Sequence, residues 1–556
     1  MEKRTIIAFV LSFLILLIWS YMYAPKKQQP PPKVQPEKPA TGVARPAETP
    51  GVQVEPLAEG GKPAPSALTP APESKEKLVT VETPLYKAVF SNAGATLKSF
   101  KLKKYHVTAD PNSPFVELVH PGQDSRGFLD ISFGTRPGQN GSKILYHTNA
   151  DSLVLGPDSK PQDVVFTATT DEGVSIKKAF RIYPDKYPIE LFVSFSNPTE
   201  KNMEGTLSVS IENIPASKTK RYYSFTGLSL LLNGKLKEVK QKKLKKEQKA
   251  FSGHIGWIAY EESYFITALI PDNPGEGVFS GRSLPSGDLV ATYTAPPISL
   301  KPQGELSSRF TLYLGPRDLT ILKQLGKKLD LAINFGWTDI IAKPLLYVLR
   351  FFNQYIHNYG VSIILLTVLI KILFWPLTHK SYKSMKEMQK LQPLMAKIRE
   401  KYKNNKEQMN KELMGLYKTY KINPMGGCLP MIIQIPVFFA LYRILGGSIE
   451  LRHAPFVLWI NDLSAPDRLF HFPFKIPFMS PPYGIPVLTL LMGLSMYIQQ
   501  KMTPTPGDPT QAKFMMFLPI IFTVMFINFP SGLVLYWLVN NILSIGQQYR
   551  IVKRLS

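Results

Sequence analysis

The chain has 556 residues, with 66 Lys and Arg against 41 Asp and Glu, which gives a formal net charge of 66 − 41 = +25. Its hydrophobic fraction of 44% is ordinary, but uncharged runs of membrane length alternate with very polar stretches, which excludes a wholly soluble protein. One cysteine, Cys428, excludes an intrachain disulfide framework, a cysteine-rich zinc site and an iron–sulfur cluster.

Residues 1–24 are predicted to form a transmembrane anchor. Residues 5–25 are a run of 21 residues without a charge, and as a helix this run covers about 30 Å, the thickness of a bilayer core. A cleaved signal peptide is the alternative, but Tyr-Met-Tyr-Ala at 21–24 lacks the small-residue cleavage pattern. The anchor is therefore the preferred interpretation.

A disordered linker and a β-domain are predicted to follow. Residues 25–75 contain 13 prolines and almost no large apolar residues, so the segment 25–76 cannot bury a core and is expected to be extended. From 77 to 318, short apolar runs such as 78–81 and 190–195 are separated by clusters of Gly, Pro, Asn and Asp. This spacing predicts one large β-sandwich.

A lysine-rich segment lies within the predicted β-domain, at 235–249. It carries eight Lys and two Glu and has no interleaved aromatic residues. That pattern favours a solvated hairpin or loop over a nucleic-acid site, because no aromatic ring is available to stack on bases. Contact with anionic lipid is a weaker alternative.

Residues 319–358 are predicted to contain a linker and an amphipathic helix over 337–357. Four apolar residues of this helix fall within about 60° of one another on a helical wheel, namely Ile341, Leu345, Val348 and Phe352. Arg350 falls on roughly the opposite face. A helix packed on the β-domain is the alternative, but a membrane span begins directly after it, which favours a helix lying in the membrane interface.

A helical membrane core is predicted over 359–549. Its first span, over 359–377, contains Thr367 and Lys371. Further spans are expected over 425–445 and 485–499 and, as a hairpin, in the 36 uncharged residues between Lys513 and Arg550, which Phe-Pro-Ser-Gly at 529–532 divides. Each arm of that hairpin would reach only about 25 Å, so it must tilt little or thin the bilayer.

The segment 379–421 between the first two spans of the core is strongly basic. It holds 12 Lys or Arg and 4 Glu, a local charge of 12 − 4 = +8. Two apolar stripes at heptad-like spacing flank a polar turn at 403–406, which predicts an antiparallel helical hairpin. Pro393 is expected to interrupt or kink its first arm.

The loop charges predict the orientation of the spans. The hairpin at +8, the 501–513 loop at +1 and the tail 550–556 at +3 alternate with a loop of net charge zero. Positive loops stay in the cytoplasm, so the β-domain is expected outside and both termini inside, with six spans in all.

No sequence motif indicates an enzyme, a metal site or a cofactor. The phosphate-binding GxxxxGK[ST] pattern, HExxH and GxSxG are all absent, and the eight histidines stand singly. The residue of interest is Lys371, placed inside a span. It either snorkels to the inner headgroups or faces a polar cavity.

The polar residues of the neighbouring spans favour the cavity. Thr367 lies one helical turn before Lys371, Gln434 lies in the next span, and Asn540 and Asn541 follow the aromatic pair Tyr536 and Trp537 in the last one. The alternative for each is an ordinary hydrogen bond between helices, worth about 0.6 kcal/mol on average. Taken together, these residues predict one polar groove.

Four segments resemble the YidC family of membrane protein insertases. They are Trp-Pro-Leu-Thr at 375–378, Asn-Pro-Met-Gly-Gly-Cys-Leu-Pro at 423–430, Leu-Arg-His-Ala-Pro at 451–455, and Phe-Pro-Ser-Gly-Leu-Val-Leu-Tyr-Trp at 529–537. The resemblance is close over 320–550. Before that it is architectural, since an anchor, a Pro-rich linker and a β-domain are typical of the Gram-negative members.

The resemblance implies an α-helical membrane protein of the bacterial inner membrane with a periplasmic all-β supersandwich similar to sugar mutarotases. Five of the six transmembrane helices would form the insertase core around a hydrophilic groove. It places six residues at groove or substrate-facing positions: Lys371, Thr367, Gln434, Tyr536, Trp537 and Asn541. Many members carry Arg at the position of Lys371, and Lys keeps the charge without the bidentate fork.

The resemblance also implies the partners: nascent membrane proteins, the Sec translocon and its accessory subunits, the ribosome or a targeting factor through the basic hairpin and tail, and the phospholipid bilayer. No cofactor and no specific nucleic acid is expected. A transporter or channel subunit with a periplasmic binding domain is the alternative, although the spans show no inverted repeat. An anchored carbohydrate-active enzyme is a third hypothesis, and it would need paired carboxylates in a cleft of the β-domain.

Overall fold

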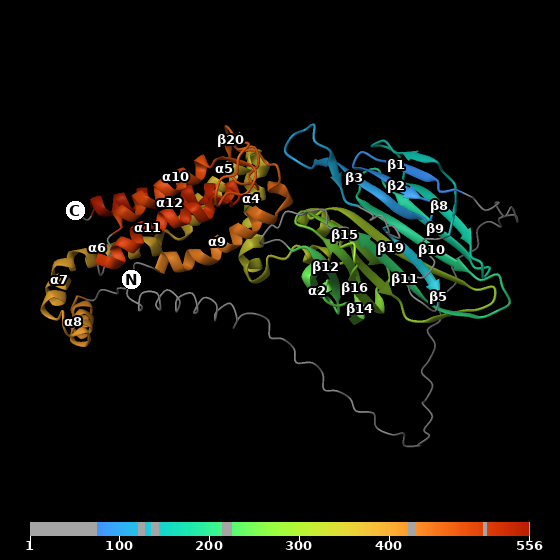
Figure 1. Ribbon diagram of the computed structural model, residues 1–556, viewed down its shortest axis with the longest axis horizontal. Helices are drawn as coiled ribbons and strands as arrows, with labels where there is room; N and C mark the ends of the chain where they lie inside the picture. The colour runs from blue at the N-terminus through green and yellow to red at the C-terminus, as the bar shows by residue number, and fades with distance from the viewer. Residues whose placement is uncertain are drawn as a thin grey trace, which may run out of the picture. The chain divides into compact units, whose positions relative to one another are not determined.

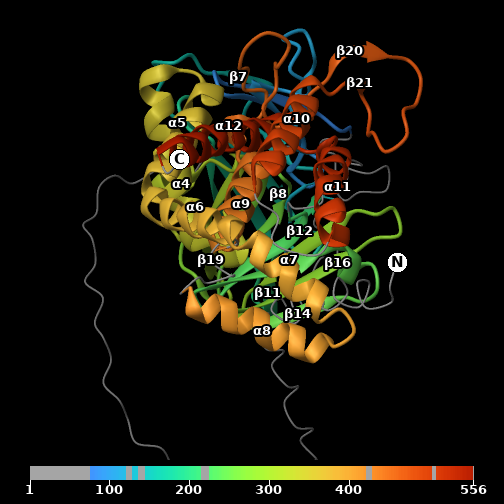
Figure 2. The same ribbon diagram turned by 90° about the vertical axis from the view of Figure 1, so that its left-hand side faces the viewer.

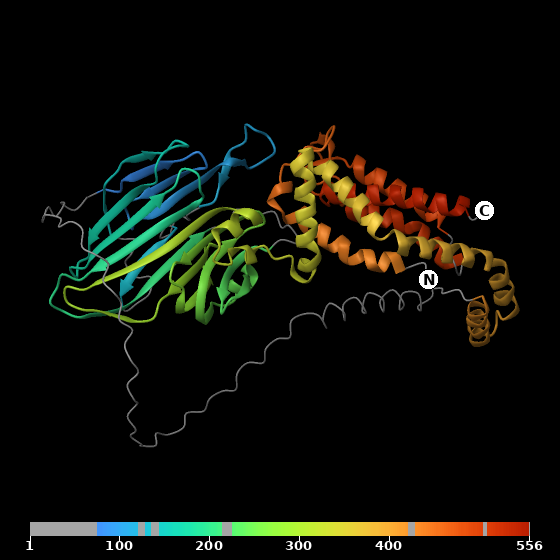
Figure 3. The same cartoon turned by 180° about the vertical axis from the view of Figure 1, so that it is seen from behind.

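A computed structural model describes residues 75–119, 128–134, 144–213, 225–420, 429–503 and 509–554 (Figures 1 and 3). The chain divides into two units, Met1–Leu68 and Thr69–Ser556, and all described residues belong to the second. The predicted anchor, nearly all of the predicted linker and the segment 421–428 with Cys428 lie outside the described residues.

The first half of the described chain is a β-sandwich, as predicted. Its smaller sheet has five strands in the order β4 (Phe115–Glu117), β3 (Thr96–His106), β2 (Tyr86–Ser91), β1 (Leu78–Glu82) and β7 (Ser152–Val154). The larger sheet has 14 strands. Its main path is β18 (Ile298–Leu300), β11 (Met203–Asn213), β17 (Leu289–Thr294), β16 (Gly275–Ser283), β14 (Lys249–Glu261), β15 (Phe265–Pro271), β19 (Glu305–Pro316), β10 (Pro188–Ser196), β9 (Ser175–Ile182), β8 (Gln162–Thr169) and β6 (His147–Thr148), with β5 (Asp130–Gly134), β12 (Gly227–Leu232) and β13 (Lys235–Lys240) branching from it.

Period-two alternation explains these strands. In β10 the residues Ile189, Leu191, Val193 and Phe195 are buried and alternate with partly exposed neighbours, so one face of the strand packs against the core. The two sheets meet through aromatic rings: Phe90 of the smaller sheet lies 4.8 Å from the ring of Phe180 in the larger one. Complete burial of a Phe side chain stabilises the folded state by about 2 to 3 kcal/mol relative to leaving it exposed.

The lysine-rich segment forms a hairpin, as predicted, with a short helix added. Strand β13 pairs with β12, and α2 (Gln241–Leu244) follows it before β14 begins. Only Val239 and Leu244 of this stretch are buried. These two residues pack against the sandwich, and the lysines around them are largely exposed to solvent.

Helix α4 (Asp339–Ile356) confirms the predicted helix but not its faces. It follows α3 (Leu319–Leu325), and its buried residues are Ala342, Leu346 and Leu349. The expected membrane face, from Ile341 to Phe352, is only partly buried against the core, whereas a different apolar strip is exposed, namely Ile340, Tyr347, Phe351 and Tyr355. Arg350, predicted on the face opposite these apolar residues, pairs with Asp318 and Glu450. A helix that is apolar over most of its circumference has no single face that the sequence can identify.

The predicted span 359–377 is wrong in one respect, because it is not a single straight helix. It consists of α5 (Tyr359–Leu373) and the beginning of α6 (Trp375–Lys390), which are bent by 64°. Pro376 explains the break, since its ring excludes a continuous helix and restricts the residue before it. Within the described chain this bent pair has the length and composition of a membrane span, and no single helix does.

The basic segment folds as the predicted helical hairpin. Helix α6 ends at Lys390, and α7 (Gln392–Lys401) begins just before Pro393, while α8 (Lys406–Thr419) starts after the predicted turn with Asn405 as its N-cap. A small separate core holds the arms together: Met388, Leu391, Met395 and Leu413. The hairpin thus has a packed seam of its own and an exposed basic surface.

The remaining helices are α9 (Leu429–Gly447), α10 (Val487–Met502), α11 (Pro509–Phe526) and α12 (Ser531–Arg554). Helix α12, at 24 residues, is longer than the predicted apolar arm because it continues through the basic residue Arg550. In Figures 1 and 3, α9 to α12 run side by side with α5, and α4 crosses near one end of them.

Candidate functional site

Helix α5 carries the first two predicted site residues. Asn358 caps the helix, accepting a bond from the backbone N–H of Val361 at 3.1 Å. Thr367 is fully buried and donates to the carbonyl of Ile363 at 2.6 Å. Its hydroxyl is therefore used within its own helix, and Thr367 serves as a close-packing residue one turn before Lys371.

Lys371 reaches across to α12. Its Nζ donates to the Ser544 hydroxyl at 2.6 Å, and Ser544 in turn donates to the Asn540 carbonyl at 2.7 Å. Lys371 is half-buried. Among the residues that the structure describes, its ammonium contacts a hydroxyl and no carboxylate. The positive charge is thus held in place without being neutralised.

Gln434 links α9 to the same helix α12. Its side-chain amide donates to the Tyr536 hydroxyl at 3.2 Å and to the Asn540 side-chain oxygen at 2.7 Å. Tyr536 is almost fully buried. Asn540 therefore connects Gln434 with Lys371. Its side chain accepts a hydrogen bond from Gln434, and its backbone carbonyl accepts one from Ser544, the partner of Lys371.

A small hollow brings these residues together. Its lining comes from α5, α6, α9 and α12 and the residue joining the first two: Ile370, Lys371, Phe374, Leu377, Thr378, Ile433, Gln434 and Asn540. The lining combines one cation, two amides and one hydroxyl with apolar side chains. Such a hollow can offer an anion or a polar chain one positive charge and several hydrogen-bonding groups.

Trp537 and Asn541 lie on other faces of α12. The Trp537 ring packs edge-on against Phe438 at 4.8 Å and against Phe526 at 5.1 Å. Asn541 is buried and donates to the Ser495 hydroxyl of α10 at 3.0 Å. Of the predicted site residues, Lys371 and Gln434 therefore line the hollow. Tyr536 is buried beside it and reaches it only through its bond with Gln434, whereas Trp537 and Asn541 contact α9, α11 and α10 elsewhere.

Three residues near Lys371 were not predicted: Ser544, Thr378 and Gln547. Gln547 donates to the Thr378 hydroxyl at 2.7 Å, and its own Oε1 is buried with no partner in the described part of the chain. A sequence signal existed, because Asn540, Ser544 and Gln547 recur at helical spacing along α12. Together they extend the polar stripe of α12 by two turns.

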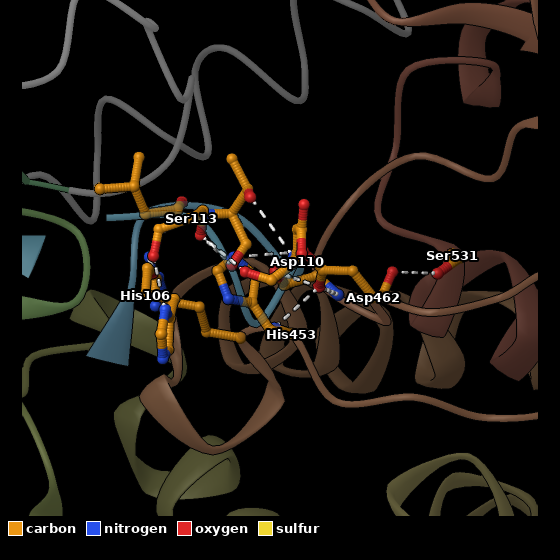
Figure 4. Close-up of polar contacts among 10 residues, drawn as sticks. His106, Asp110, Ser113, His453, Asp462 and Ser531 are labelled. Atoms are coloured by element: carbon orange, nitrogen blue, oxygen red, sulfur yellow. Dashed lines mark hydrogen bonds and ion pairs between the residues drawn. The ribbon is translucent and has the colours of Figure 1, made fainter. Parts of the chain in front are cut away.

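The start of α12 is fixed by the loop that contains the Leu-Arg-His-Ala-Pro segment. The Asp462 carboxylate accepts from the His453 backbone N–H at 3.1 Å, and the Ser531 hydroxyl donates to the Asp462 carbonyl at 2.9 Å (Figure 4). On the other side, Arg452 donates to the carbonyl of His106 at 2.5 Å. The segments at 451–455 and 529–537 thus meet, which sets the axial position of α12 and of its polar stripe.

The described residues contain no group of three or more His, Cys, Asp or Glu that could hold a metal ion. The fold and the site together define a class: a protein with apolar helices around a polar, positively charged hollow and a large β-sandwich before them.

The comparisons with known proteins identify that class. Residues 351–556 match the family described as 60Kd inner membrane protein, and residues 78–348 match the YidC periplasmic domain. The membrane protein insertase YidC of Syntrophobacter fumaroxidans is 44% identical over 555 residues, covering 99% of each chain. That of Pelobacter propionicus is 41% identical over 559 residues, covering 100% of this chain and 99% of the relative. A solved structure, described as an active YidC insertase with its first transmembrane domain resolved, is 18% identical with a TM-score of 0.36, over 86% of this chain and 95% of that one.

The chain belongs to the YidC family of membrane protein insertases. The resemblance found in the sequence is thereby confirmed. It is an inner-membrane protein with a periplasmic β-sandwich domain, it acts on nascent membrane proteins, and it is not an enzyme.

Proposed function

We propose that the hollow around Lys371 is the groove through which this insertase receives the polar part of a nascent membrane protein. The observation that carries the proposal is the meeting of Lys371, Gln434 and Asn540, from three different helices, at one lined hollow. A cation inside a membrane core is energetically costly, so such residues usually pair with another group or face a polar cavity, and they often mark a functional site. Here it has a hydroxyl partner that a substrate carboxylate can replace.

The proposed mechanism is electrostatic and needs no nucleotide or metal. A polar or acidic substrate segment loses water when it enters the bilayer, and a positively charged, hydrogen-bonding groove lowers that cost. Lys offers a mobile point charge, so it attracts many acidic segments without demanding one geometry. The hydrophobicity of the substrate and the membrane potential acting on its charges then drive insertion.

We propose the following membrane arrangement. Residues 1–24 form a transmembrane anchor, 25–76 a linker, 77–318 the periplasmic domain, 319–358 a linker with an interfacial helix, and 359–549 a five-helix core. The +8 charge of the hairpin 379–421 and the basic tail 550–556 support a cytoplasmic location for both. The β-domain then lies in the periplasm, and both termini lie in the cytoplasm.

The basic hairpin is the proposed contact for a ribosome or targeting factor. Its arms hold together through their own small core, so its lysines are presented on an independent surface. That surface suits an acidic partner such as ribosomal RNA or an acidic protein face without sequence readout. The periplasmic domain is the proposed contact for the Sec translocon and its accessory subunits.

Complementation tests the groove. A bacterium depleted of its insertase receives the wild type, Lys371→Arg, Lys371→Ala or Lys371→Glu, and insertion of a short acidic-tailed test protein is measured together with membrane levels. Lys501→Ala is the matched control, because Lys501 is an exposed lysine at the end of helix α10, outside the hollow and the basic hairpin. The proposal expects Arg and the control to support insertion, and Ala and Glu to fail at normal protein levels. Full insertion by Lys371→Ala would refute the charged groove for that substrate.

A further inference from the structure

A protruding hairpin between α9 and α10 exposes several phenylalanines. Strands β20 (Leu469–Phe472) and β21 (Tyr483–Ile485) pair at its base. Three phenylalanines are largely exposed: Phe470 at 66%, Phe474 at 60% and Phe478 at 80%. Figure 2 shows this hairpin reaching sideways past α10 and α11. Exposed aromatic clusters of this kind mark interaction surfaces.

The base of the hairpin is held rigidly. Arg468 is buried, and it donates from Nε to the Pro482 carbonyl at 2.9 Å and from Nη1 to the Ile527 carbonyl at 2.8 Å. Asn528 donates to the Phe478 carbonyl at 2.8 Å and accepts from the Ser480 N–H at 2.7 Å. These hydrogen bonds attach the loop to the turn between α11 and α12. They hold the loop in the conformation that exposes its phenylalanines.

The backbone itself favours this outward display. Phe470 and Phe478 both have positive φ, +56° and +61°, a conformation that bulky residues rarely adopt and that costs free energy. Collapse of the aromatic rings onto the protein would relieve their exposure. Retaining an unfavourable backbone while exposing both rings indicates a surface that is covered by something else.

The charges identify the covering surface. No Asp or Glu occurs between Asp467 and Asp508, and the hairpin carries one lysine, Lys475, among its phenylalanines. Aromatic rings with an adjacent lysine suit the phosphate and carbonyl level of a bilayer. The neighbouring helix α10 continues the apolar surface with Leu490 and Leu494, which are 51% and 56% exposed. The exposed residues of the hairpin and of α10 are thus both mainly apolar and include no acidic residue.

We propose that residues 469–485 form a wing that lies in the interface of the periplasmic leaflet, with its phenylalanines immersed and Lys475 at the lipid phosphates. The inference rests on the proposed topology, in which this loop is periplasmic. Its consequence is mechanical: the wing fixes the depth and tilt of α10 and α11 beside the groove, much as α4 lies across the helix ends.

Depth measurement on the full chain tests the wing. A nitroxide label is attached at Phe474→Cys, and separately at Phe478→Cys, in a Cys428→Ser background that retains insertion activity. The protein is reconstituted in vesicles of phosphatidylethanolamine and phosphatidylglycerol, and collisions with oxygen and with a water-soluble nickel chelate are compared. Two exposed apolar positions serve as references: Ile520→Cys on α11, 60% exposed, for lipid, and Val154→Cys on β7, 73% exposed, for water.

The proposal expects the ratio of oxygen to nickel collisions at both wing positions to exceed that at 154 at least threefold. A ratio equal to that at 154 overturns the proposal that the wing lies in lipid. The proposal also fails if the label becomes protected only when a translocon is added, because the partner of the wing is then a protein. If position 520 is also water-exposed, the proposed membrane core fails together with the wing. Lipid contact at 520 with water at 474 and 478 refutes the wing alone.

Discussion

Two inward-pointing lysines, one in the β-sandwich and one in the helical core, show what separates a structural cation from a site. Lys178 of β9 is fully buried, and its Nζ donates to the carbonyl of Gly94 at 2.7 Å and lies 4.8 Å from the centre of the Tyr146 ring. Burial lowers the pKa of Lys178 to about 8, although Asp130 acts in the opposite direction. Both groups that Lys178 contacts, a backbone carbonyl and a buried ring, belong to the framework of the sandwich.

Lys371 has the opposite surroundings. It is only half-buried, its partner is the Ser544 hydroxyl, and it lines a hollow. A backbone carbonyl and a ring cannot leave Lys178 without unfolding the sandwich, whereas a hydroxyl can yield to a substrate carboxylate. Burial of a charge by itself therefore indicates nothing about function. The proposed role of Lys371 rests on its exchangeable partner and on the polar hollow beside it.

The largest effect is expected from Lys178→Ala. The substitution leaves a cavity in the core, removes the hydrogen-bond donor of the Gly94 carbonyl and takes away the cation near Asp130. Truncating a long, fully buried side chain to Ala costs about 2 to 5 kcal/mol. The unfolding midpoint of the sandwich should fall markedly in the detergent-solubilised full chain, followed by tryptophan fluorescence from the buried Trp257.

Lys177→Ala is the matched control for this substitution. Lys177 is the exposed neighbour on the same strand, and its removal should change the free energy of unfolding by roughly 0.5 kcal/mol or less. Equal midpoints for the two variants would contradict the structural role of Lys178. Insertion per folded molecule should remain normal in both, which separates Lys178 from Lys371.

A pH effect of about 1 to 2 kcal/mol is expected from the same residue. The folded pKa of Lys178 is lowered to about 8 from 10.5, so between these values the unfolded state binds more protons than the folded one. Stability therefore rises with pH across that window, and below pH 8 the full cost of burying the charge is present. The difference in unfolding free energy between the wild type and Lys178→Met should shift by this amount from pH 8 to pH 10. A constant difference would contradict the lowered pKa.

The sequence predicted the sandwich well because its strands carry the signal themselves. Alternation in 190–195 is enough to identify β10, and the apolar stripes of 379–421 with Pro393 identify the hairpin and its break. Alternation, apolar stripes and a proline break each depend only on residues close together in the sequence, so the sequence alone is enough to predict them. The bend at Phe374 was missed although Pro376 signalled it, because the apolar run continues across the bend without interruption.

The site was only partly predictable for a related reason. Lys371 and Gln434 were found because polar residues inside an apolar run are conspicuous, but a helix in lipid has no sequence period that shows which neighbour each face meets. On a helical wheel Asn540 is offset by about 100° from Asn541 and by about 60° from Trp537. Of these three residues Asn540 alone lines the hollow, and the sequence does not show which of them does so. Arg350 shows the same limit, since its partners Asp318 and Glu450 are distant in sequence.

Ser544→Ala is expected to have an intermediate effect, on insertion rather than on folding. It removes the partner that aims Lys371 into the hollow, and a hydrogen bond to a charged group is worth about 1.5 kcal/mol or more. Insertion of the acidic-tailed test protein should slow by about tenfold, less than in Lys371→Ala, and Ser544→Thr should restore most of the rate. Ser495→Ala is the control, since Ser495 is the hydroxyl that Asn541 binds on another face of α12. Equal slowing in the control would indicate a general packing effect.

The smallest effect is expected from Tyr536→Phe. The hydroxyl accepts one bond from Gln434 at 3.2 Å, and Gln434 keeps its shorter bond to Asn540 at 2.7 Å. Losing one such interhelical bond costs about 0.6 kcal/mol, less than a threefold change in rate. Gln434→Leu removes both bonds and the amide that lines the hollow, so it should slow insertion more than Tyr536→Phe at the same membrane level. If the two variants slow insertion equally, the Tyr536 hydroxyl contacts the substrate itself, and the groove extends along α12 beyond the hollow that Lys371 and Asn540 line.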